Sequence, residues 1–209
     1  MPTKDRRAFA PQAIGFFLRQ DYKHRELVII DDGSDAIQDI VPVDTRIRYL
    51  RLETNHSIGN KRNLACEAAK GEIILHWDDD DWHADWRISY QVNALLDPGA
   101  DICGLDQVYF YNPDTSQAWK YSYPKSAKSW VYGGTLCYFK DFWRRNPFED
   151  VAVGEDNRFI WSDQEKRILP LEKNTFYVAI IHPGNTSPKK MTGKRWRQVD
   201  TKNIQKIMA

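Results

Sequence analysis

The sequence predicts an α/β protein with a mostly parallel central sheet flanked by helices. Over residues 1–100, apolar runs typical of strands alternate with amphipathic runs typical of helices, and the joints between them are short. After residue 100, strand-like runs are joined by turn residues, which predicts a smaller mixed or antiparallel sheet. A chain of 209 residues can bury one sizeable core, so we expect a single domain.

The first half shows both periodicities. Ile14, Phe17 and Leu18 recur at the spacing of one helix face, and Ser57 is a residue type that begins helices. The run Leu27–Ile30 is continuously apolar, as in a buried strand. Helices are therefore expected over residues 7–20, 57–70 and 83–96, and strands over residues 26–30, 46–52 and 73–77.

The second half is expected to begin with a hairpin. Asn112, Pro113 and Asp114 are turn residues that separate two strand-like runs. A later strand is entered through two glycines, which allow close approach of another backbone or a ligand. Strands are expected over residues 101–110, 118–123, 131–139 and 175–181, a helix over residues 154–161, and a mobile basic tail over residues 189–209.

Four consecutive carboxylates, Asp78 to Asp81, follow the apolar run of residues 73–77, which reads as a strand buried on both faces. We call residues 78–81 the acidic turn. Its like charges repel unless a metal ion or cationic side chains neutralise them. Since α/β proteins bind ligands at the carboxyl ends of strands, the turn is typical of a divalent ion held against nucleotide phosphates. The alternative is a solvated turn that caps the next helix.

Two other sets of polar residues follow strand ends. Asp31 and Asp32 come after the strand of residues 26–30, and His182 comes after the strand of residues 175–181. Their position puts them on the ligand-binding side of a parallel sheet. The alternatives are an ordinary Asx turn for the aspartates and a structural role for the histidine.

Composition indicates which kinds of binding partner and which cellular compartment to expect. With 30 Lys and Arg against 29 Asp and Glu, the net charge of +1 does not favour nucleic-acid binding. The 8 Trp and 10 Tyr suit carbohydrate stacking, although core packing is their commoner role. Cys66, Cys103 and Cys137 have no paired spacing, which predicts buried thiols in a reducing cytosol. We find no leader and no apolar run near the ~20 residues of a membrane span, and expect a cytoplasmic protein.

Six segments carry a resemblance to a known family. They are Pro2-Thr3-Lys4-Asp5-Arg6, the strand end Asp31-Asp32-Gly33-Ser34, the helix start Gly59-Asn60-Lys61-Arg62-Asn63, the acidic turn, the glycines Gly133-Gly134 and the pair Glu155-Asp156. In this order they resemble the motifs of the inverting glycosyltransferases of family 2, over nearly the whole chain. The resemblance implies the GT-A fold with a Rossmann-like sheet, in which residues 1–100 bind a nucleotide-sugar, residues 101–188 bind the acceptor and residues 189–209 form the tail.

The resemblance also implies how the donor is held. A divalent ion, Mn²⁺ or Mg²⁺, would be bound mainly by Asp80, with Asp78 and His182 as further ligands, while Asp81 would support them or cap the next helix. For Lys61 and Arg62 the alternatives are pairing with carboxylates or a solvated basic face. The implied nucleotide-binding residues are Pro2, Thr3, Asp5, Arg6, Asp31, Asp32, Lys61, Arg62, Asp78 and Asp79.

For the acceptor, the resemblance makes Asp156 the general base and gives Glu155 a positioning role. The alternative is that both carboxylates only cap a helix start, where they favour the helix dipole. Gly133, Gly134 and Trp161 would contact the acceptor, and for Trp161 core packing is the alternative. We expect a UDP-hexose donor and a glycan or lipid-linked glycan acceptor, with the protein at the inner face of the membrane.

The sequence differs from the family's pattern in one respect, and two alternative functions have to be weighed. Relatives carry about five apolar residues of a first strand before the Pro-Thr loop, whereas this sequence starts at Met1, so most of that strand is expected to be missing. A nucleotidyltransferase would need a glycine-rich phosphate loop, which residues 2–6 do not supply. A non-catalytic carbohydrate-binding or scaffold domain is the other alternative, and the joint presence of Asp78, Asp80 and Asp156 argues against it.

Overall fold

Three parallel strands form the sheet of the N-terminal half in the computed structural model, which describes residues 1–96 and 99–209. They are β1 (Pro2–Thr3), β2 (Leu27–Asp31) and β3 (Ile47–Arg51), and β2 lies between the other two. All five residues of β2 are buried, as its continuous apolar run predicts. Asp31 therefore ends a buried strand, and the chain turns immediately after it.

The helices of the first half begin close to where the sequence predicts them. They are α1 (Ala10–Arg19), α2 (Ile58–Ala68) and α3 (Arg87–Leu95). Ile14 and Phe17 of α1 are buried in one core cluster with Leu27 and Ile29 of β2. The side chain of Ser57 accepts a hydrogen bond from the backbone N–H of Asn60, which caps the start of α2.

A four-stranded mixed sheet has the order β10-β6-β9-β4. The expectation that residues 73–77 form a strand buried on both faces is wrong. Strand β4 is shorter and half-buried, and it lies at the edge of its sheet, paired antiparallel with β9. The residues of β4 line a groove of about 870 Å³ together with Leu27 and Val28 of β2, and this groove leaves β4 only partly buried. The strands are β4 (Ile73–Leu75), β6 (Ile102–Gly104), β9 (Cys137–Phe139) and β10 (Ile168–Pro170).

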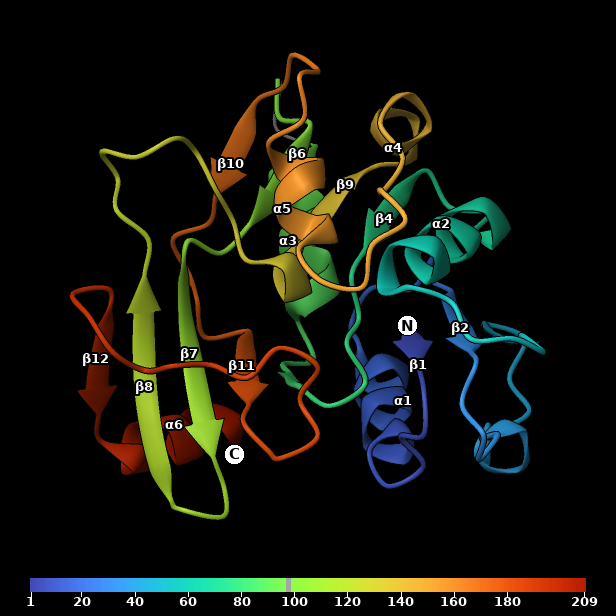
Figure 1. The fold of residues 1–209 in the computed structure, drawn as a ribbon, viewed down its shortest axis with the longest axis horizontal. Helices are drawn as coiled ribbons and strands as arrows, with labels where there is room; N and C mark the ends of the chain where they lie inside the picture. Colours follow the sequence, from blue (N-terminus) through green and yellow to red (C-terminus); the bar gives the residue numbers. More distant parts are fainter. Residues whose placement is uncertain (97–98) are drawn as a thin grey trace.

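A five-stranded sheet has the order β12-β8-β7-β11-β5, and it lies on the opposite side of the molecule from β1 and β2 in Figure 1. The predicted hairpin is confirmed as β7 and β8, which pair antiparallel. The strands are β5 (Trp82–His83), β7 (Gln107–Asn112), β8 (Gln117–Ser122), β11 (Tyr177–Ile180) and β12 (Trp196–Val199).

Three elements have other bounds in the structure than the sequence predicts. The single strand expected over residues 101–110 is wrong, because the backbone N–H of Leu105 donates to the hydroxyl of Thr135 and the chain passes from β6 into a different sheet at β7. The strand over residues 131–139 reduces to β9, since its first part is a 3₁₀ helix, η2 (Gly133–Thr135). The helix expected from residue 83 begins at Arg87, because β5 pairs with β11.

The expected mobile tail is also wrong, because residues 196–208 form β12 and the helix α6 (Thr201–Met208). Strand β12 pairs antiparallel with β8, and α6 crosses behind β7 and β8 in Figure 1. Ile204 is fully buried in a cluster with Ala118 and Val178. The helical spacing of Ile204 and Ile207 was the signal in the sequence for this element.

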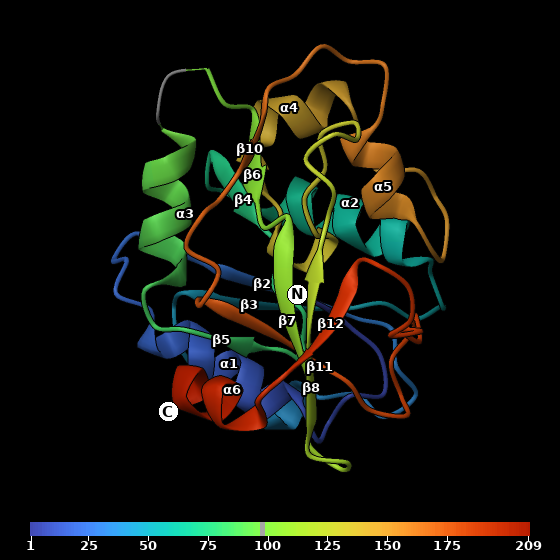
Figure 2. The ribbon, with the colours of Figure 1, turned by 90° about the vertical axis from the view of Figure 1, so that its left-hand side faces the viewer.

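The remaining helices are η1 (Gln38–Ile40), α4 (Lys140–Arg145) and α5 (Glu155–Ile160), and Figure 2 shows α4 and α5 above α2. Phe159 of α5 stacks on Phe148 with ring centroids 4.2 Å apart, which fixes the helix that begins with Glu155 and Asp156. The three cysteines are buried thiols, as predicted. Among the helices of residues 1–96 and 99–209, none has the length and apolar character to cross a bilayer.

Candidate active site

A cleft of about 580 Å³ is lined by segments that are far apart in the sequence. The loop of residues 2–6, the start of α2, the acidic turn, the start of α5 and the loop of residues 184–187 all contribute side chains. The predicted site residues that line the cleft are Pro2, Thr3, Asp5, Arg6, Lys61, Arg62, Asp78, Asp79, Asp80, Glu155 and Asp156. The predicted site residues outside this lining are Asp31, Asp32, Gly133, Gly134, Trp161 and His182.

Asp80 of the acidic turn is surrounded by polar groups from two other segments. One carboxylate oxygen lies 2.9 Å from Nε2 of His182 and accepts a hydrogen bond from Nδ2 of Asn185 at 3.3 Å. Nη2 of Arg6 lies 3.7 Å from the same oxygen. The ring of His182 also stacks on Phe9, with centroids 4.4 Å apart. The structure thus brings His182 to Asp80, as the predicted metal site requires.

The two neighbouring aspartates are buried. Asp81 accepts hydrogen bonds from the hydroxyl of Tyr177 and, at 2.8 Å, from the backbone N–H of Ile180, so it anchors the turn to β11. Burial, together with repulsion from Asp80, raises the pKa of Asp79 to about 7. The carboxyl of Asp79 therefore takes up a proton more readily than that of an exposed aspartate.

Arg62 connects the two halves of the cleft. Its Nε donates to Oε1 of Glu155 at 3.0 Å, and its Nη2 lies 3.5 Å from Oδ1 of Asp78. Burial lowers the pKa of Arg62, but the charges of Asp78, Glu155 and Asp156 raise it by more, so the net shift is upward. Of the alternatives for Arg62, pairing with carboxylates is the one that the structure shows.

The two glycines of η2 lie against the carboxylates of both halves. A Cβ at Gly133 would overlap Oδ2 of Asp156, and a Cβ at Gly134 would lie 2.7 Å from Oδ2 of Asp78. Oδ1 of Asp156 accepts a hydrogen bond from the backbone N–H of Asn157 at 2.7 Å. Glycine is therefore required here for close approach, although neither glycine lines the cleft.

Replacing Gly133 with alanine should displace the carboxylate of Asp156. We expect kcat to fall about 100-fold, because a shift of ~1 Å in a reacting group has an effect of that size. The measurement is kcat for donor turnover by folded protein. The control is Gly15→Ala on α1, where the only close atom to the new Cβ is Nη1 of Arg19 at 3.6 Å. Equal kcat for the two variants would contradict the expected role of the glycine.

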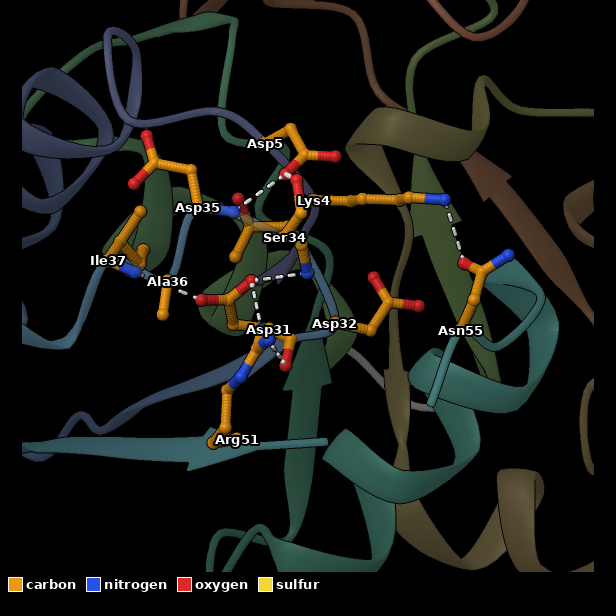
Figure 3. Close-up of polar contacts among 12 residues, drawn as sticks. Lys4, Asp5, Asp31, Asp32, Ser34, Asp35, Ala36, Ile37, Arg51 and Asn55 are labelled. Carbon is orange, nitrogen blue, oxygen red and sulfur yellow. Dashed lines mark hydrogen bonds and ion pairs between the residues drawn. The ribbon is translucent and has the colours of Figure 1, made fainter. Parts of the chain in front are cut away.

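Asp31 is held by the turn after β2 and by the neighbouring strand β3 (Figure 3). Its Oδ1 accepts from the N–H of Gly33 at 2.9 Å, and its Oδ2 accepts from the N–H of Ile37 at 3.1 Å and from the hydroxyl of Tyr49 at 2.7 Å. Arg51 adds an ion pair at 3.4 Å. The Asx-turn alternative therefore describes Asp31, whose side chain is fully buried.

Asp32 and Lys61 form a buried ion pair. Nζ of Lys61 lies 2.6 Å from Oδ1 of Asp32 and donates to the backbone carbonyl of Thr3 at 3.2 Å. The other oxygen of Asp32 accepts from the N–H of His56 at 2.8 Å. These contacts tie β1, β2 and α2 together beneath the cleft.

The loop after β1 rests on the turn after β2 (Figure 3). Oδ1 of Asp5 accepts from the hydroxyl of Ser34 at 2.9 Å and from the N–H of Asp35 at 3.0 Å, and these hydrogen bonds lower the pKa of Asp5. Thr3 lines the cleft, and its buried hydroxyl has no hydrogen-bond partner within the described chain. A ligand in the cleft could supply that partner.

Trp161 lies outside the lining, partly exposed, and its Nε1 donates to the carbonyl of Ser129 at 3.1 Å. Sequence reasoning missed Asn185, Tyr132 and Tyr177, of which the first two line the cleft and the third holds Asp81. Asn185 lies in the turn directly after His182, and a search for amides beside the predicted ligand would have found it.

The donor set around Asp80 fits a divalent ion that shares its coordination with a ligand. A carboxylate oxygen and an imidazole nitrogen are both available, and such ligands suit Mn²⁺. Over residues 1–96 and 99–209, no three His, Cys, Asp or Glu side chains form a complete metal-binding group. The remaining ligands would have to come from a bound diphosphate and water.

The parallel sheet with its acidic turn, and the cleft between this turn and the start of α5, define a glycosyltransferase fold of the GT-A class. Residues 1–153 match the family described as Glycosyl transferase family 2, and the chain belongs to that family. The match ends before Glu155 and Asp156, so it does not itself cover the predicted general base.

Two curated relatives each match less than half of the chain. An uncharacterized glycosyltransferase of Haemophilus influenzae is 33% identical over 101 residues, which are 46% of this chain and 40% of that protein. A Campylobacter jejuni protein named GalNAc(5)-diNAcBac-PP-undecaprenol beta-1,3-glucosyltransferase is 32% identical over 88 residues, which are 39% of this chain and 28% of that protein. The chain thus spans less than half the length of these relatives.

Two solved structures share the fold. Staphylococcus aureus TarS (residues 1–349) in complex with UDP-GlcNAc has a TM-score of 0.70 at 20% identity, over 88% of this chain and 58% of that one. The mannosyltransferase PcManGT of Pyrobaculum calidifontis, in complex with GDP-Man and Mn²⁺, has a TM-score of 0.68 at 16% identity, over 86% and 55% of the two chains. Since these shares of the chain exceed the 153 residues of the family match, the likeness extends past residue 153.

Proposed function

We propose that the protein transfers a sugar, with inversion, from a nucleotide-diphosphate donor to a hydroxyl of a glycan or lipid-linked glycan. The observation that carries the proposal is the cleft in which Arg62 joins Asp78 of the acidic turn to Glu155, directly beside Asp156. This arrangement puts a donor-side carboxylate and a candidate base on the same cavity. Family membership and the donors bound by TarS and PcManGT support the proposal.

Asp80, His182 and Asp78 are the proposed protein ligands of a divalent ion, Mn²⁺ or Mg²⁺, and Asp78 would also lie near the ribose. The ion would neutralise the charge that develops on the departing diphosphate. Arg6, which lies 3.7 Å from Asp80, supplies a further positive charge at the place where that diphosphate would lie. The buried hydroxyl of Thr3 is free to bond the nucleotide.

Asp156 is the proposed general base. As the acceptor oxygen bonds to the anomeric carbon, the bond from that carbon to the diphosphate oxygen breaks on the opposite face. The acceptor proton passes to a carboxylate oxygen of Asp156, whose Oδ1 is oriented by the N–H of Asn157. Glu155, held by Arg62, would keep the start of α5 in place. Direct displacement requires no covalent enzyme intermediate.

The test is binding of UDP and turnover of nucleotide-sugars. In isothermal titration, we expect UDP to bind more than about tenfold tighter with Mn²⁺ than with EDTA, since an ion on a diphosphate contributes several kcal/mol. Among UDP-glucose, UDP-GlcNAc and GDP-mannose, we expect slow release of nucleoside diphosphate from one donor. Pyrophosphate release from UTP would instead indicate a nucleotidyltransferase, and absence of all binding would indicate a scaffold.

A further inference from the structure

Arg87 is a fully buried arginine at the first position of α3, and the proposed chemistry does not use it. Its Nε donates to Oε1 of Gln91 at 2.9 Å, and its Nη1 lies 2.6 Å from Nδ1 of His83. Its Nη2 donates to two backbone carbonyls, that of His76 at 2.8 Å and that of Gly134 at 2.9 Å. Each of the three guanidinium nitrogens thus has at least one hydrogen-bond partner.

These hydrogen-bond partners are neutral groups. The guanidinium carbon lies 5.2 Å from the ring centroids of Trp77 and Tyr177 and 5.8 Å from that of Phe176. Burial lowers the pKa of Arg87 to about 10, so the side chain remains charged at neutral pH. A buried cation costs several kcal/mol unless its surroundings compensate it. Carbonyl dipoles and ring faces provide that compensation here.

The two carbonyls belong to the two sides of the cleft. His76 directly follows β4, two residues before the acidic turn, and Gly134 belongs to η2, which lies against Asp78 and Asp156. One nitrogen of Arg87 therefore joins the donor side to the acceptor side. Gln91, which Arg87 orients, adds a second link, because its Nε2 donates to the carbonyl of Thr135 at 2.7 Å.

His83 extends the connection into the acidic turn itself. Burial, together with the charge of Arg87, lowers the pKa of His83 well below its ordinary value, so the ring is neutral. Because Arg87 donates to Nδ1, the ring proton lies on Nε2, which is 3.3 Å from the backbone carbonyl of Asp78. Arg87 thus sets the tautomer that allows His83 to hold Asp78.

We propose that Arg87 is a positioning residue that fixes the acidic turn against η2 and so keeps the donor and acceptor sides of the cleft in one geometry. Its meaning for catalysis rests on the proposed glycosyl transfer. The hydrogen bonds themselves do not depend on it.

The test compares Arg87→Lys, which keeps the charge and loses the forked hydrogen bonds, with Arg25→Lys as the matched control. Arg25 also donates to backbone carbonyls, those of Phe17 at 3.1 Å and Leu18 at 2.8 Å, and lies over the Phe17 ring, but these partners belong to neither the acidic turn nor η2. For Arg87→Lys we expect amide hydrogen exchange about tenfold faster in both segments 76–83 and 132–136. Arg25→Lys should accelerate exchange only near residues 17–25.

A second measurement is UDP binding in the presence of Mn²⁺. We expect the dissociation constant to rise about tenfold for Arg87→Lys and to stay unchanged for Arg25→Lys. The proposal would be overturned if folded Arg87→Lys had wild-type exchange and wild-type affinity. A third variant, Arg87→Met, removes the charge as well. If only this variant showed an effect, the role would belong to the charge alone, and the proposal would again be overturned. If wild-type protein binds no UDP, the proposed function is wrong. The hydrogen-exchange comparison alone then tests whether Arg87 fixes the acidic turn against η2.

If Arg87→Lys does not fold, His83→Phe replaces it. This variant keeps an aromatic ring and removes the link to the carbonyl of Asp78. We expect faster exchange in residues 76–83 with unchanged protection in residues 132–136. Unchanged exchange in both segments would overturn the proposed connection.

Discussion

Replacing Asp156 with asparagine should abolish sugar transfer while leaving donor binding intact. The amide keeps the size of the carboxylate beside Gly133, and its oxygen can still accept from the N–H of Asn157. It cannot take a proton from the acceptor, and loss of general base catalysis lowers kcat by about 10²–10⁴-fold. Donor turnover and UDP affinity, measured on the same preparation, separate the two effects.

Asp141→Asn is the matched control for this prediction. Asp141 is an exposed aspartate on α4, 76% accessible, and it pairs with Arg144 at the surface. Its amide variant should turn over donor at the wild-type rate. If Asp156→Asn also retained a near wild-type rate, another group would have to accept the proton, and the assignment of the base would be wrong.

Local patterns predicted the parts of the fold that depend on few neighbours. The apolar run of β2 and the helix face of Ile14 and Phe17 specify a buried strand and an amphipathic helix wherever they pack. The segment from residue 102 was divided wrongly because Leu105 bonds to Thr135, a contact that spans 30 residues. Strand β5 likewise exists only because β11 pairs with it.

In the candidate site, too, local motifs predicted some residues, whereas the roles of others depend on tertiary contacts. Motif order predicted many of the residues that line the cleft, since each motif follows a strand or begins a helix, but it missed Asn185 and Tyr132. It could not show that Lys61 is already paired with Asp32, because the partner of a charged side chain depends on tertiary packing. Arg87 was missed for the same reason, since its carbonyl partners lie 11 and 47 residues away and backbone groups leave no mark in a sequence.

Arg62→Met should produce the largest loss of stability among substitutions in the cleft. The variant keeps the aliphatic stem and leaves the buried carboxylate of Glu155 without its cationic partner, together with the partly buried Asp78. Breaking a buried ion pair in this way costs about 3–5 kcal/mol of unfolding free energy. The measurement is the denaturant midpoint near neutral pH, converted to free energy with the m-value. Arg144→Met, which breaks an exposed pair with Asp141, should cost less than about 1 kcal/mol.

The loss from Arg62→Met should also depend on pH in a defined direction. Burial already raises the pKa of Glu155 in the wild-type protein, although Arg62 opposes that shift. Without Arg62 the pKa rises further, so the folded variant binds more protons than the unfolded chain between the ordinary glutamate pKa and the raised one. Unfolding free energy then falls as pH increases through this window. The difference from wild type should be smallest near the ordinary glutamate pKa and largest above the raised one. A difference that is independent of pH would show that Glu155 is not the group that Arg62 stabilises.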